Sequence, residues 1–451
     1  MEENTGTAAL LCGFGKREIT PPIGTPLVGH YKQRFAKGVL DPLYVRAALF
    51  ESAGTRAVIF TMDILLVQEE WATRIRKKVG KTYGVDPDAV LITSSHTHTG
   101  PMTTDDTASG KKVDPEYVAF LEEQAFCAAG DACADLAPAR LFYAEKELPG
   151  ISFIRRYRMK DGTVKTNPKD GTDIDHPEGK PNETLRLLQI RREGADDIYM
   201  VNFGTHADTI GGEYISADWP GFLCSILERA IPGSKCMFLL GPEGDANHVT
   251  PFKENKGRLI SERKDEDVRE TAAHARYMGR AVAGQILTMC DRAEEIGNEG
   301  VAFAAEEMQL PSNKNNEEID EARRINGIYM EGRAKEEGIV QVQIARARRV
   351  IRNFDAPPFF TYHAYAIRIG ALAFVGVPGE PFTELGFRIY AASPFAHTIV
   401  FCTTNASCGY VPTSSAFEVK GSYETNVSRI NKGSDDAYVQ AAERALKALK
   451  K

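Results

Sequence analysis

The sequence of 451 residues contains no run of about 18 apolar residues, the length that a membrane helix needs. It also lacks a basic excess, because 55 lysines and arginines stand against 62 aspartates and glutamates, for a formal net charge of -7. Proteins that bind nucleic acid need a positive face, and this charge balance does not indicate one. The N-terminus lacks the basic and then apolar pattern of a signal peptide. We therefore expect a cytoplasmic protein without a transmembrane segment or a nucleic-acid partner.

Closely spaced cysteines are missing as well. The eight cysteines form no CxxC pair, which excludes a zinc ribbon or a thioredoxin motif and leaves isolated buried thiols as the expectation. Apolar residues, by contrast, make up 43% of the chain. That share is enough for a large core and excludes a disordered protein.

Short apolar runs alternate with amphipathic stretches, and this alternation predicts an α/β fold. The runs are rich in valine, isoleucine, leucine and phenylalanine, as buried strands are. We predict such strands within residues 56–68, 88–94, 197–204, 235–241, 371–378 and 398–406. Helical spacing of apolar residues predicts helices over 114–136, 220–230, 262–290, 381–391 and 435–450. The stretch 311–355 is dense in charge and is interpreted as a solvated helical insertion.

Polar clusters follow the predicted strands, where open α/β sheets bind their ligands. The clearest is His96-Thr97-His98. In an extended segment, residues two apart point to the same side, so both imidazoles could face one metal ion or one substrate atom. A pair of hydrogen-bonded histidines in a turn is the alternative.

Three further residues follow later strands and have ordinary structural interpretations. His206 could be a buried histidine that is bonded to Asp208. The carboxylate of Glu380 could interact with the positive N-terminal end of a helix, and Tyr410 could be a core tyrosine. Taken one at a time, none of them indicates a catalytic centre.

Six motifs, taken together in their order, resemble the catalytic domain of the neutral/alkaline non-lysosomal ceramidases, which are zinc amidases. The resemblance spans nearly the whole chain and implies a single catalytic domain over residues 1–451, with mixed sheets flanked by helices. The motifs lie at residues 13–31, 94–102 (SSHTHTGPM), 202–209 (NFGTHADT), 216–222, 376–380 (GVPGE) and 409–413 (GYVPT).

The resemblance also implies a set of functional residues around a zinc ion. It implies that His98 contacts the reacting oxygen of the substrate, that Tyr423 is catalytic, and that Arg156 binds substrate, with Arg155 as the competing assignment. Asp63 and Asp218 are candidates to orient the ligand histidines. The implied zinc ligands are His96, His206, Glu380 and Tyr410.

The sequence departs from the ceramidase pattern in three respects. No serine or threonine occurs between Lys235 and His248, where ceramidases carry a serine. A C-terminal immunoglobulin-like domain and a secretion signal are also missing from the sequence, so we expect a small-molecule substrate smaller or more polar than ceramide. Asp245, Glu243, His248 and Glu424 are the candidates for the general base, and the alternative role of Asp245 is to cap a turn.

These observations support one main functional hypothesis. The chain is expected to be a zinc-dependent hydrolase that cleaves a carboxylic amide by metal-activated water. A zinc esterase or lactonase with the same site, and a zinc-stabilised binding protein without activity, are the alternatives.

Overall fold

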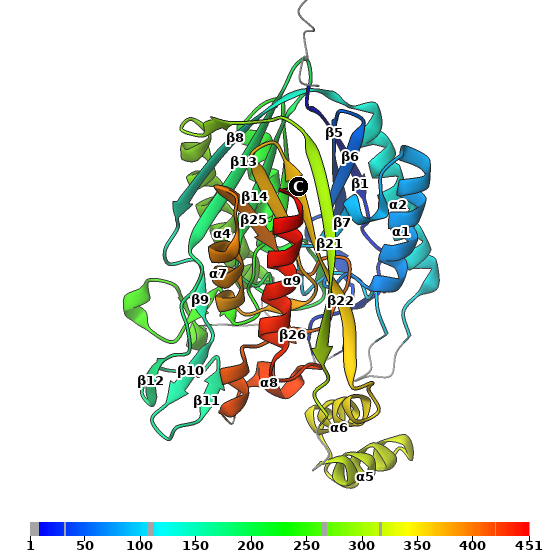
Figure 1. Cartoon of the computed structure of the whole chain (residues 1–451). Helices are drawn as coiled ribbons and strands as arrows, with labels where there is room; N and C mark the ends of the chain where they lie inside the picture. The colour runs from blue at the N-terminus through cyan, green and yellow to red at the C-terminus, as the bar shows by residue number, and fades with distance from the viewer. Residues whose placement is uncertain are drawn as a thin grey trace, which may run out of the picture.

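The computed structural model describes residues 9–30, 33–105, 112–262, 268–314, 318–419 and 421–450. Two main sheets are flanked by helices (Figure 1), which confirms the predicted α/β fold with mixed sheets. Within these ranges, no helix has the length and apolar content to cross a membrane. All eight cysteines are free thiols, either buried or partly buried.

The larger sheet is mixed, with parallel pairs at its two ends. Its order is β16-β14-β13-β8-β1-β5-β6-β7, and β20 pairs with β8. The pairs β14/β16 and β6/β7 are parallel, and the other pairs are antiparallel. The bounds are β1 Leu11–Glu18, β5 Tyr44–Ser52, β6 Thr55–Met62, β7 Val90–Ser94, β8 Ala137–Glu147, β13 Thr184–Arg192, β14 Asp197–Phe203, β16 Ser234–Leu240 and β20 Glu294–Ile296.

The second sheet has the order β21-β22-β23-β25 and contains one parallel pair, β23/β25. Its strands are β21 Val301–Pro311, β22 Phe359–Ile369, β23 Leu372–Gly376 and β25 His397–Phe401. A small third sheet has the order β11-β10-β12, with β10 Arg156–Met159, β11 Val164–Thr166 and β12 Ile174–Pro177. The other strands of the described residues form short pairs, namely β2 Pro26–Leu27 with β3 Arg34–Phe35, β4 Gly38–Val39 with β15 Tyr214–Ile215, β9 Phe153–Ile154 with β17 Ala246–Asn247, β18 Val249–Thr250 with β19 Arg258–Leu259, and β24 Glu380–Pro381 with β26 Tyr410–Val411.

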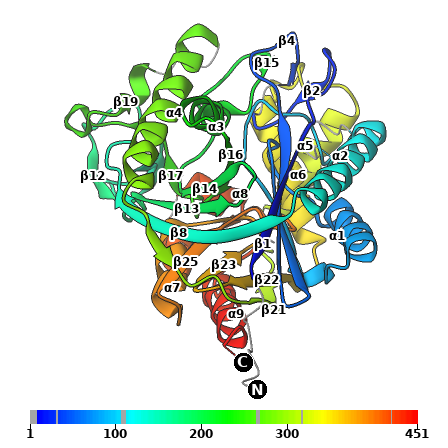
Figure 2. The ribbon, with the colours of Figure 1, turned by 90° about the horizontal axis from the view of Figure 1, so that it is seen from above.

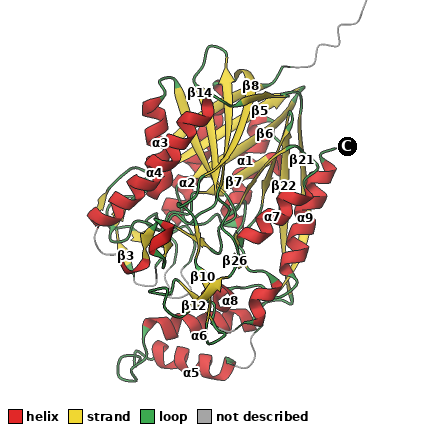
Figure 3. Cartoon of the chain, turned by 90° about the vertical axis from the view of Figure 1, so that its left-hand side faces the viewer, coloured by secondary structure: helices red, strands yellow, loops and turns green. Residues whose placement is uncertain are grey.

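Helices cover the outer faces of both sheets (Figure 2). One pair packs beside β1, β5 and β7, another packs beside β13 and β16, and a third covers the second sheet. In that order the pairs are α1 Glu69–Tyr83 with α2 Pro115–Ala134, α3 Asp218–Ala230 with α4 Val268–Cys290, and α7 Thr383–Ala392 with α9 Ser434–Ala448. The charged stretch 311–355 contains α5 Ile319–Met330 and α6 Gln341–Phe354, which lie with α8 Tyr423–Val427 at one end of the molecule (Figure 3).

The loop that follows β25 joins the two ends of the larger sheet. The amide of Cys402 donates to the carbonyl of Leu240 at the end of β16, over 2.9 Å. The amide of Asn405 donates to the carbonyl of Ile92 in β7 over 2.8 Å, and Oδ1 of Asn405 accepts the amide of Ile92 over 2.9 Å. The carboxyl ends of the three parallel pairs therefore meet in one place, as the position of the polar clusters predicted.

The six predicted strands are all present, although two end earlier than expected, the one within 56–68 at Met62 and the one within 398–406 at Phe401. β6 ends at Met62, and Asp63 accepts hydrogen bonds from the amide of Tyr44 and from Arg46, at 2.9 Å each. The prediction that Asp63 orients a ligand histidine is therefore wrong, because its Oδ2 binds the neighbouring strand β5.

Candidate metal centre and active site

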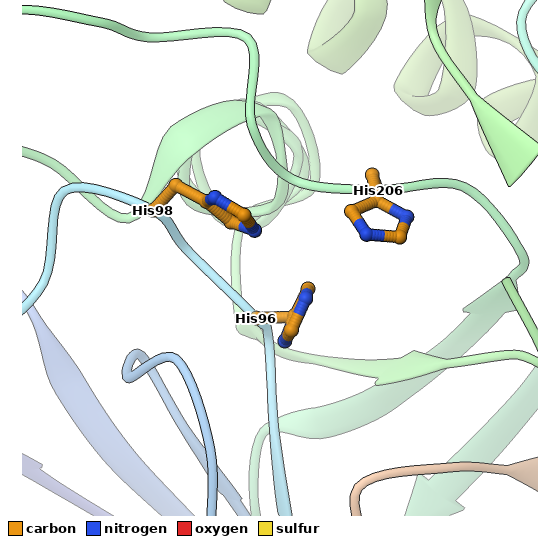
Figure 4. Close-up of side chains that lie close together, drawn as sticks. All are labelled: His96, His98 and His206. Carbon is orange, nitrogen blue, oxygen red and sulfur yellow. The ribbon is translucent and has the colours of Figure 1, made fainter. Parts of the chain in front are cut away.

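Three histidines from two loops face one another at the carboxyl ends of the strands (Figure 4). The ring centroid of His96 lies 4.9 Å from that of His98 and 5.1 Å from that of His206. Glu380 reaches the same place from the short strand β24. Its Oε2 lies 3.4 Å from Nε2 of His96 and 3.7 Å from Nε2 of His206. Four residues from three segments that are far apart in sequence therefore form one cluster.

The backbone sets the orientation of all three imidazoles. Nδ1 of His96 lies 2.8 Å from the carbonyl of Leu65, Nδ1 of His98 lies 2.9 Å from that of Gly29, and Nδ1 of His206 lies 2.9 Å from that of Ala246. A carbonyl only accepts, so Nδ1 carries the proton in each ring. In the neutral ring each Nε2 then keeps its lone pair, which is the form in which imidazole binds a metal ion.

Several acceptor atoms in this cluster are buried without a hydrogen-bond donor. Among the described side chains these include Nε2 of His96, Nε2 of His98 and Oε2 of Glu380. Buried polar atoms in proteins almost always have a partner, so the absence of donors points to a cation that accepts their lone pairs. Two imidazoles with a carboxylate are typical ligands of zinc. The donor set therefore fits the metal that was predicted.

His96 has a backbone conformation that residues other than glycine rarely adopt, with φ of 63°. Such strain concentrates at functional sites. The prediction placed His96 and His98 in an extended segment, but β7 ends at Ser94 and the chain turns at His96. The two imidazoles do face the same centre, although a turn brings them there rather than strand alternation. The amide of His98 also donates to the carbonyl of Ala207, which ties this loop to the one that carries His206.

Glu243 is a member of this cluster that the sequence analysis treated only as a possible base. It lies in the loop after β16 and is fully buried. Its carboxylate contacts Nδ1 of His206, and its oxygens lie within 4.8 Å of donor atoms of His96, His206 and Glu380. Because it approaches His206 on the Nδ1 edge, opposite Nε2, its position is that of a carboxylate that orients a ligand histidine. The signal in the sequence was an acidic residue between glycines directly after a buried strand.

Of the two candidate arginines, Arg155 rather than Arg156 contacts the cluster. Nη1 of Arg155 lies 3.1 Å from Nε2 of His206, its Nε donates to Glu424 over 2.7 Å, and its Nη2 donates to the carbonyl of Gly244 over 2.9 Å. Arg156 donates to Ser422 over 3.0 Å and lies over the ring of Phe382. Neighbouring residues in extended backbone point to opposite sides, so only one of the two can face the centre. The position of Arg155 favours the competing assignment, and which of the two arginines binds substrate stays a prediction.

The two tyrosines that the resemblance singled out lie beside the cluster. Tyr410 is the parallel partner of Glu380 across the β24/β26 pair, and its ring stacks near His206 at 6.5 Å between centroids. Burial, and next the charge of Glu380, raise the pKa of Tyr410 well above its usual value. Tyr423 is the first residue of α8, and its ring centroid lies 5.8 Å from that of Tyr410. Their roles as metal ligand and catalytic group stay predictions.

The predicted base Asp245 has the surroundings of a helix cap. Its Oδ1 accepts the amide of Thr383 over 2.7 Å, and its Oδ2 lies 3.3 Å from the hydroxyl of Thr383, the first residue of α7. Burial raises its pKa to about 6, although the bonds from Thr383 and the charge of Arg156 oppose that rise. Asp245 and Arg156 line a cavity that none of the three histidines of the cluster lines. These contacts favour a structural role for Asp245.

The other residues weighed from the sequence also have structural partners. Glu424 accepts bonds from Arg155, Thr166 and Ser422. Nε2 of His248 lies 2.9 Å from Oδ1 of Asp208, and Nδ1 of His248 lies 3.0 Å from Nε2 of His274. Asp218 is the first residue of α3, and it accepts bonds from the hydroxyl of Thr209 and from the amide of Ile210. Asp218 thus holds the loop after His206 and does not bind the imidazole itself.

Burial and neighbouring charges separate the pKa values within the cluster. Burial lowers the pKa of His96, but the carboxylate of Glu380 outweighs it and raises the value to about 9 in the ion-free site. Without an ion, a proton on Nε2 of His96 therefore faces Glu380, and a metal ion bound there would take the place of that proton. Burial raises the pKa of Glu380, and the charge of His96 outweighs it and lowers the value to about 2. Burial, and next the charge of His96, lower the pKa of His98 well below its usual value. His98 is therefore neutral near pH 7.

A cavity of about 320 Å³ opens beside the cluster. Its polar lining comes from His96, His98, Glu380, Tyr410 and Tyr423. Its apolar lining comes from Leu27, Val28, Leu65, Leu66 and Met102. Ligand cavities in proteins measure roughly 300–1,000 Å³, so this one is at the small end of the range.

The predicted resemblance to the neutral ceramidases is confirmed for the fold. The chain is similar to the crystal structure of the neutral ceramidase from Pseudomonas aeruginosa, with a TM-score of 0.74 at 17% identity over 98% of this chain and 75% of that one. It is similar to a ceramidase complexed with C2, with a TM-score of 0.73 at 17% identity and the same coverage. No protein-family model and no curated protein sequence matches the chain.

Proposed function

We propose that this protein is a zinc-dependent hydrolase that cleaves the carboxylic amide bond of a small molecule. The observation that carries the proposal is the group of donor-free acceptor atoms on His96, His98 and Glu380 beside the cavity. The fold shared with ceramidases supports the choice of the amide bond. We also infer that residues 1–451 form one catalytic domain, because segments from most of the chain contribute to this centre.

His96, His206 and Glu380 would hold the zinc ion, and Tyr410 is placed beside Glu380 to be the fourth ligand. When bound, zinc would polarise the substrate carbonyl and lower the pKa of a nearby water molecule. The lone pair on Nε2 of His206 serves one partner at a time. The hydrogen bond that Arg155 now makes to that nitrogen would therefore be released to an oxygen of the substrate when the ion is present.

His98 is suited to be the general base of the reaction. Its Nδ1 proton is held by the carbonyl of Gly29, so its buried Nε2 is an acceptor that faces the cavity. In this tautomer it can take a proton from the attacking water and afterwards give that proton to the leaving amine. We therefore propose that His98 takes the proton of the attacking water. The contact between His98 and the reacting oxygen of the substrate, which the resemblance implies, stays a prediction.

The attacking group is proposed to be water rather than a side chain of the loop after β16. That loop contains no serine or threonine between Lys235 and His248. Its buried carboxylates lie against other side chains, Glu243 against His206 and Asp245 against Thr383. Hydrolysis would then proceed without an acyl-enzyme on this loop.

The cavity supports a substrate smaller than long-chain ceramide. A volume of about 320 Å³ leaves room for a short acyl chain along its apolar lining, but not for two long chains. We therefore propose a short-chain or polar N-acyl amine as the substrate.

Turnover on matched N-acyl amines, esters and lactones tests the proposal. We expect hydrolysis of short-chain amides and little or no hydrolysis of detergent-solubilised long-chain ceramide. Efficient ceramide hydrolysis would contradict the substrate assignment. A preference for esters or lactones would make the protein an esterase, and stoichiometric zinc without turnover on any member of the panel would make it a binding protein.

Rapid acid quench followed by intact-mass measurement tests the route of attack. Direct attack by water predicts unmodified protein at every time point. A covalent adduct with the mass of the acyl group would overturn it.

A further inference from the structure

A second group of polar atoms without partners lies away from the cavity, between α6 and the segment that follows α8. Arg349 and Arg352 are three residues apart on α6, so their side chains project from the same face of the helix. Asn353 of α6 donates to the carbonyl of Ser428 over 3.1 Å, which places the next residue, Arg429, against the same end of α6. Figures 1 and 3 both show α6 beside α8. We call Arg349, Arg352 and Arg429 the arginine cluster.

These arginines lack the carboxylate partners that many other arginines of this protein have. Among the described residues, none of the three makes an ion pair, whereas Arg346 on the same helix binds Glu318 over 2.7 Å. Nε of Arg349 and Nε of Arg429 are buried and have no hydrogen-bond acceptor. Arg352 donates only to the neutral side chain of Asn353, at 3.1 and 3.2 Å. The cluster therefore combines three positive charges with unused donors.

Such an arrangement is unfavourable unless an anion is present. Burial, and next the charges of Arg429 and Arg349, lower the pKa of Arg352 to about 10. The nearby side chains are aromatic rather than acidic, and the guanidinium of Arg429 lies 4.6 Å from the ring centroid of Phe360. Removing a charge from water without a counter-charge costs free energy, so three mutually repelling guanidinium groups call for a ligand of opposite sign.

We propose that the arginine cluster binds a tetrahedral oxyanion of the phosphate class. A guanidinium presents parallel donors that match two oxygens of phosphate, and three such groups together can bind an anion with several oxygens. None of the three arginines lines the cavity beside His98, so this binding site is separate from the proposed active site. The ligand is either free phosphate or the phosphate headgroup of a lipid.

Thermal unfolding in increasing sodium phosphate tests the free anion, against sodium chloride at the same ionic strength. We expect phosphate to raise the melting temperature by roughly 2–4 °C at saturation. Arg352→Gln and Arg429→Gln should abolish this rise. Arg346→Gln is the matched control, because it removes a paired arginine from the same helix and should keep the full response. Arg352→Lys, which retains the charge without the two parallel donors, should keep only part of it.

Vesicle sedimentation separates the two sources of phosphate. Vesicles of phosphatidylcholine are compared with vesicles that also contain phosphatidic acid. Co-sedimentation only with the second kind, lost in Arg429→Gln but kept in Arg346→Gln, would assign the lipid headgroup. A phosphate response without co-sedimentation would assign the free anion. Equal responses to phosphate and chloride, together with no vesicle binding, would overturn the proposal, as would a phosphate response that survives both cluster variants.

Discussion

The histidine–glutamate centre and the arginine cluster both contain buried polar atoms without partners, but the atoms have opposite character. Around His96, His98 and Glu380 the unused atoms are acceptors with lone pairs. Around Arg349 and Arg429 they are N–H donors. The first group lies where the carboxyl ends of three parallel strand pairs meet, whereas the second lies on a peripheral helix and the segment beside it.

The comparison shows how the sign of the missing partner indicates the ligand. Surplus acceptors in a buried place attract a cation, and surplus donors that carry positive charge attract an anion. The centre also has backbone carbonyls that fix each imidazole, which is the support expected of a metal site. The arginines have no comparable support, which is consistent with a weaker and reversible ligand.

The largest effect should come from removing metal ligands. His96→Ala and His206→Ala each delete one imidazole nitrogen that would bind the zinc ion. We therefore expect loss of the bound zinc and a fall in turnover of roughly 10³-fold or more. Elemental analysis of protein purified without added metal checks the first effect, with about one zinc per wild-type chain as the reference. Metal-free protein with full activity would contradict the proposal that the histidine–glutamate centre binds a catalytic cation. Both variants should retain the phosphate response of the arginine cluster.

A second prediction compares a paired arginine with an unpaired one. Arg155→Gln would leave Glu424 buried without its main charge partner, so we expect a loss of about 3–5 kcal/mol in the free energy of unfolding. Arg352→Gln removes a repelling charge and should be neutral or slightly stabilising in chloride buffer. Denaturant unfolding of both variants measures the difference. Equal destabilisation by the two substitutions would show that the arginine cluster is not short of a counter-charge.

A third prediction separates proton transfer from metal binding within the centre. His98→Ala should keep its zinc, because His96, His206 and Glu380 remain, but it should lose roughly 10²–10⁴-fold in kcat. Wild-type kcat should also be low in acid and rise with pH as Nε2 of His98 becomes free to accept a proton. Loss of zinc in His98→Ala would instead make this histidine a ligand.

The smallest effect is expected at Asp245. Because it caps α7, Asp245→Asn should cost only about 1 kcal/mol of stability and leave kcat nearly unchanged. Its pKa is raised to about 6 in the folded protein from 3.8, so the carboxyl contributes most stability below pH 4 and loses that contribution as the pH rises through 6. The stability of wild type relative to Asp245→Asn should therefore fall over this interval. A strong fall in kcat would return Asp245 to the role of base.

Local pattern in the sequence was sufficient for the strands and most of the helices. The apolar runs 197–204 and 235–241 became β14 and β16 almost residue for residue, because buried strands need continuous apolar side chains. The strand predicted within 56–68 extends beyond the real one, because β6 ends at Met62 and the next residue, Asp63, accepts a hydrogen bond from the neighbouring strand. That contact depends on a partner strand that no local pattern indicates.

The candidate site was less accessible to sequence reasoning. His96 and His98 were found from their spacing, but the turn that orients them depends on contacts with Leu65 and Gly29. The choice between Arg155 and Arg156 depends on which face of one extended segment meets the centre, and a shift of one residue reverses it. The arginine cluster has no motif at all, since Arg429 joins the helix only through the packing of Ser428 against α6.

The sequence by itself therefore determined the α/β class, the buried strands and the resemblance to ceramidases, because these depend on residue type and local order. Only the tertiary structure decided that Glu243 belongs to the centre, that Asp245 caps a helix, and that His98 presents an acceptor to the cavity. Each of these depends on the burial and the hydrogen-bond partners of a side chain. Those partners come from segments tens to hundreds of residues away, and the chain brings them together only when it folds.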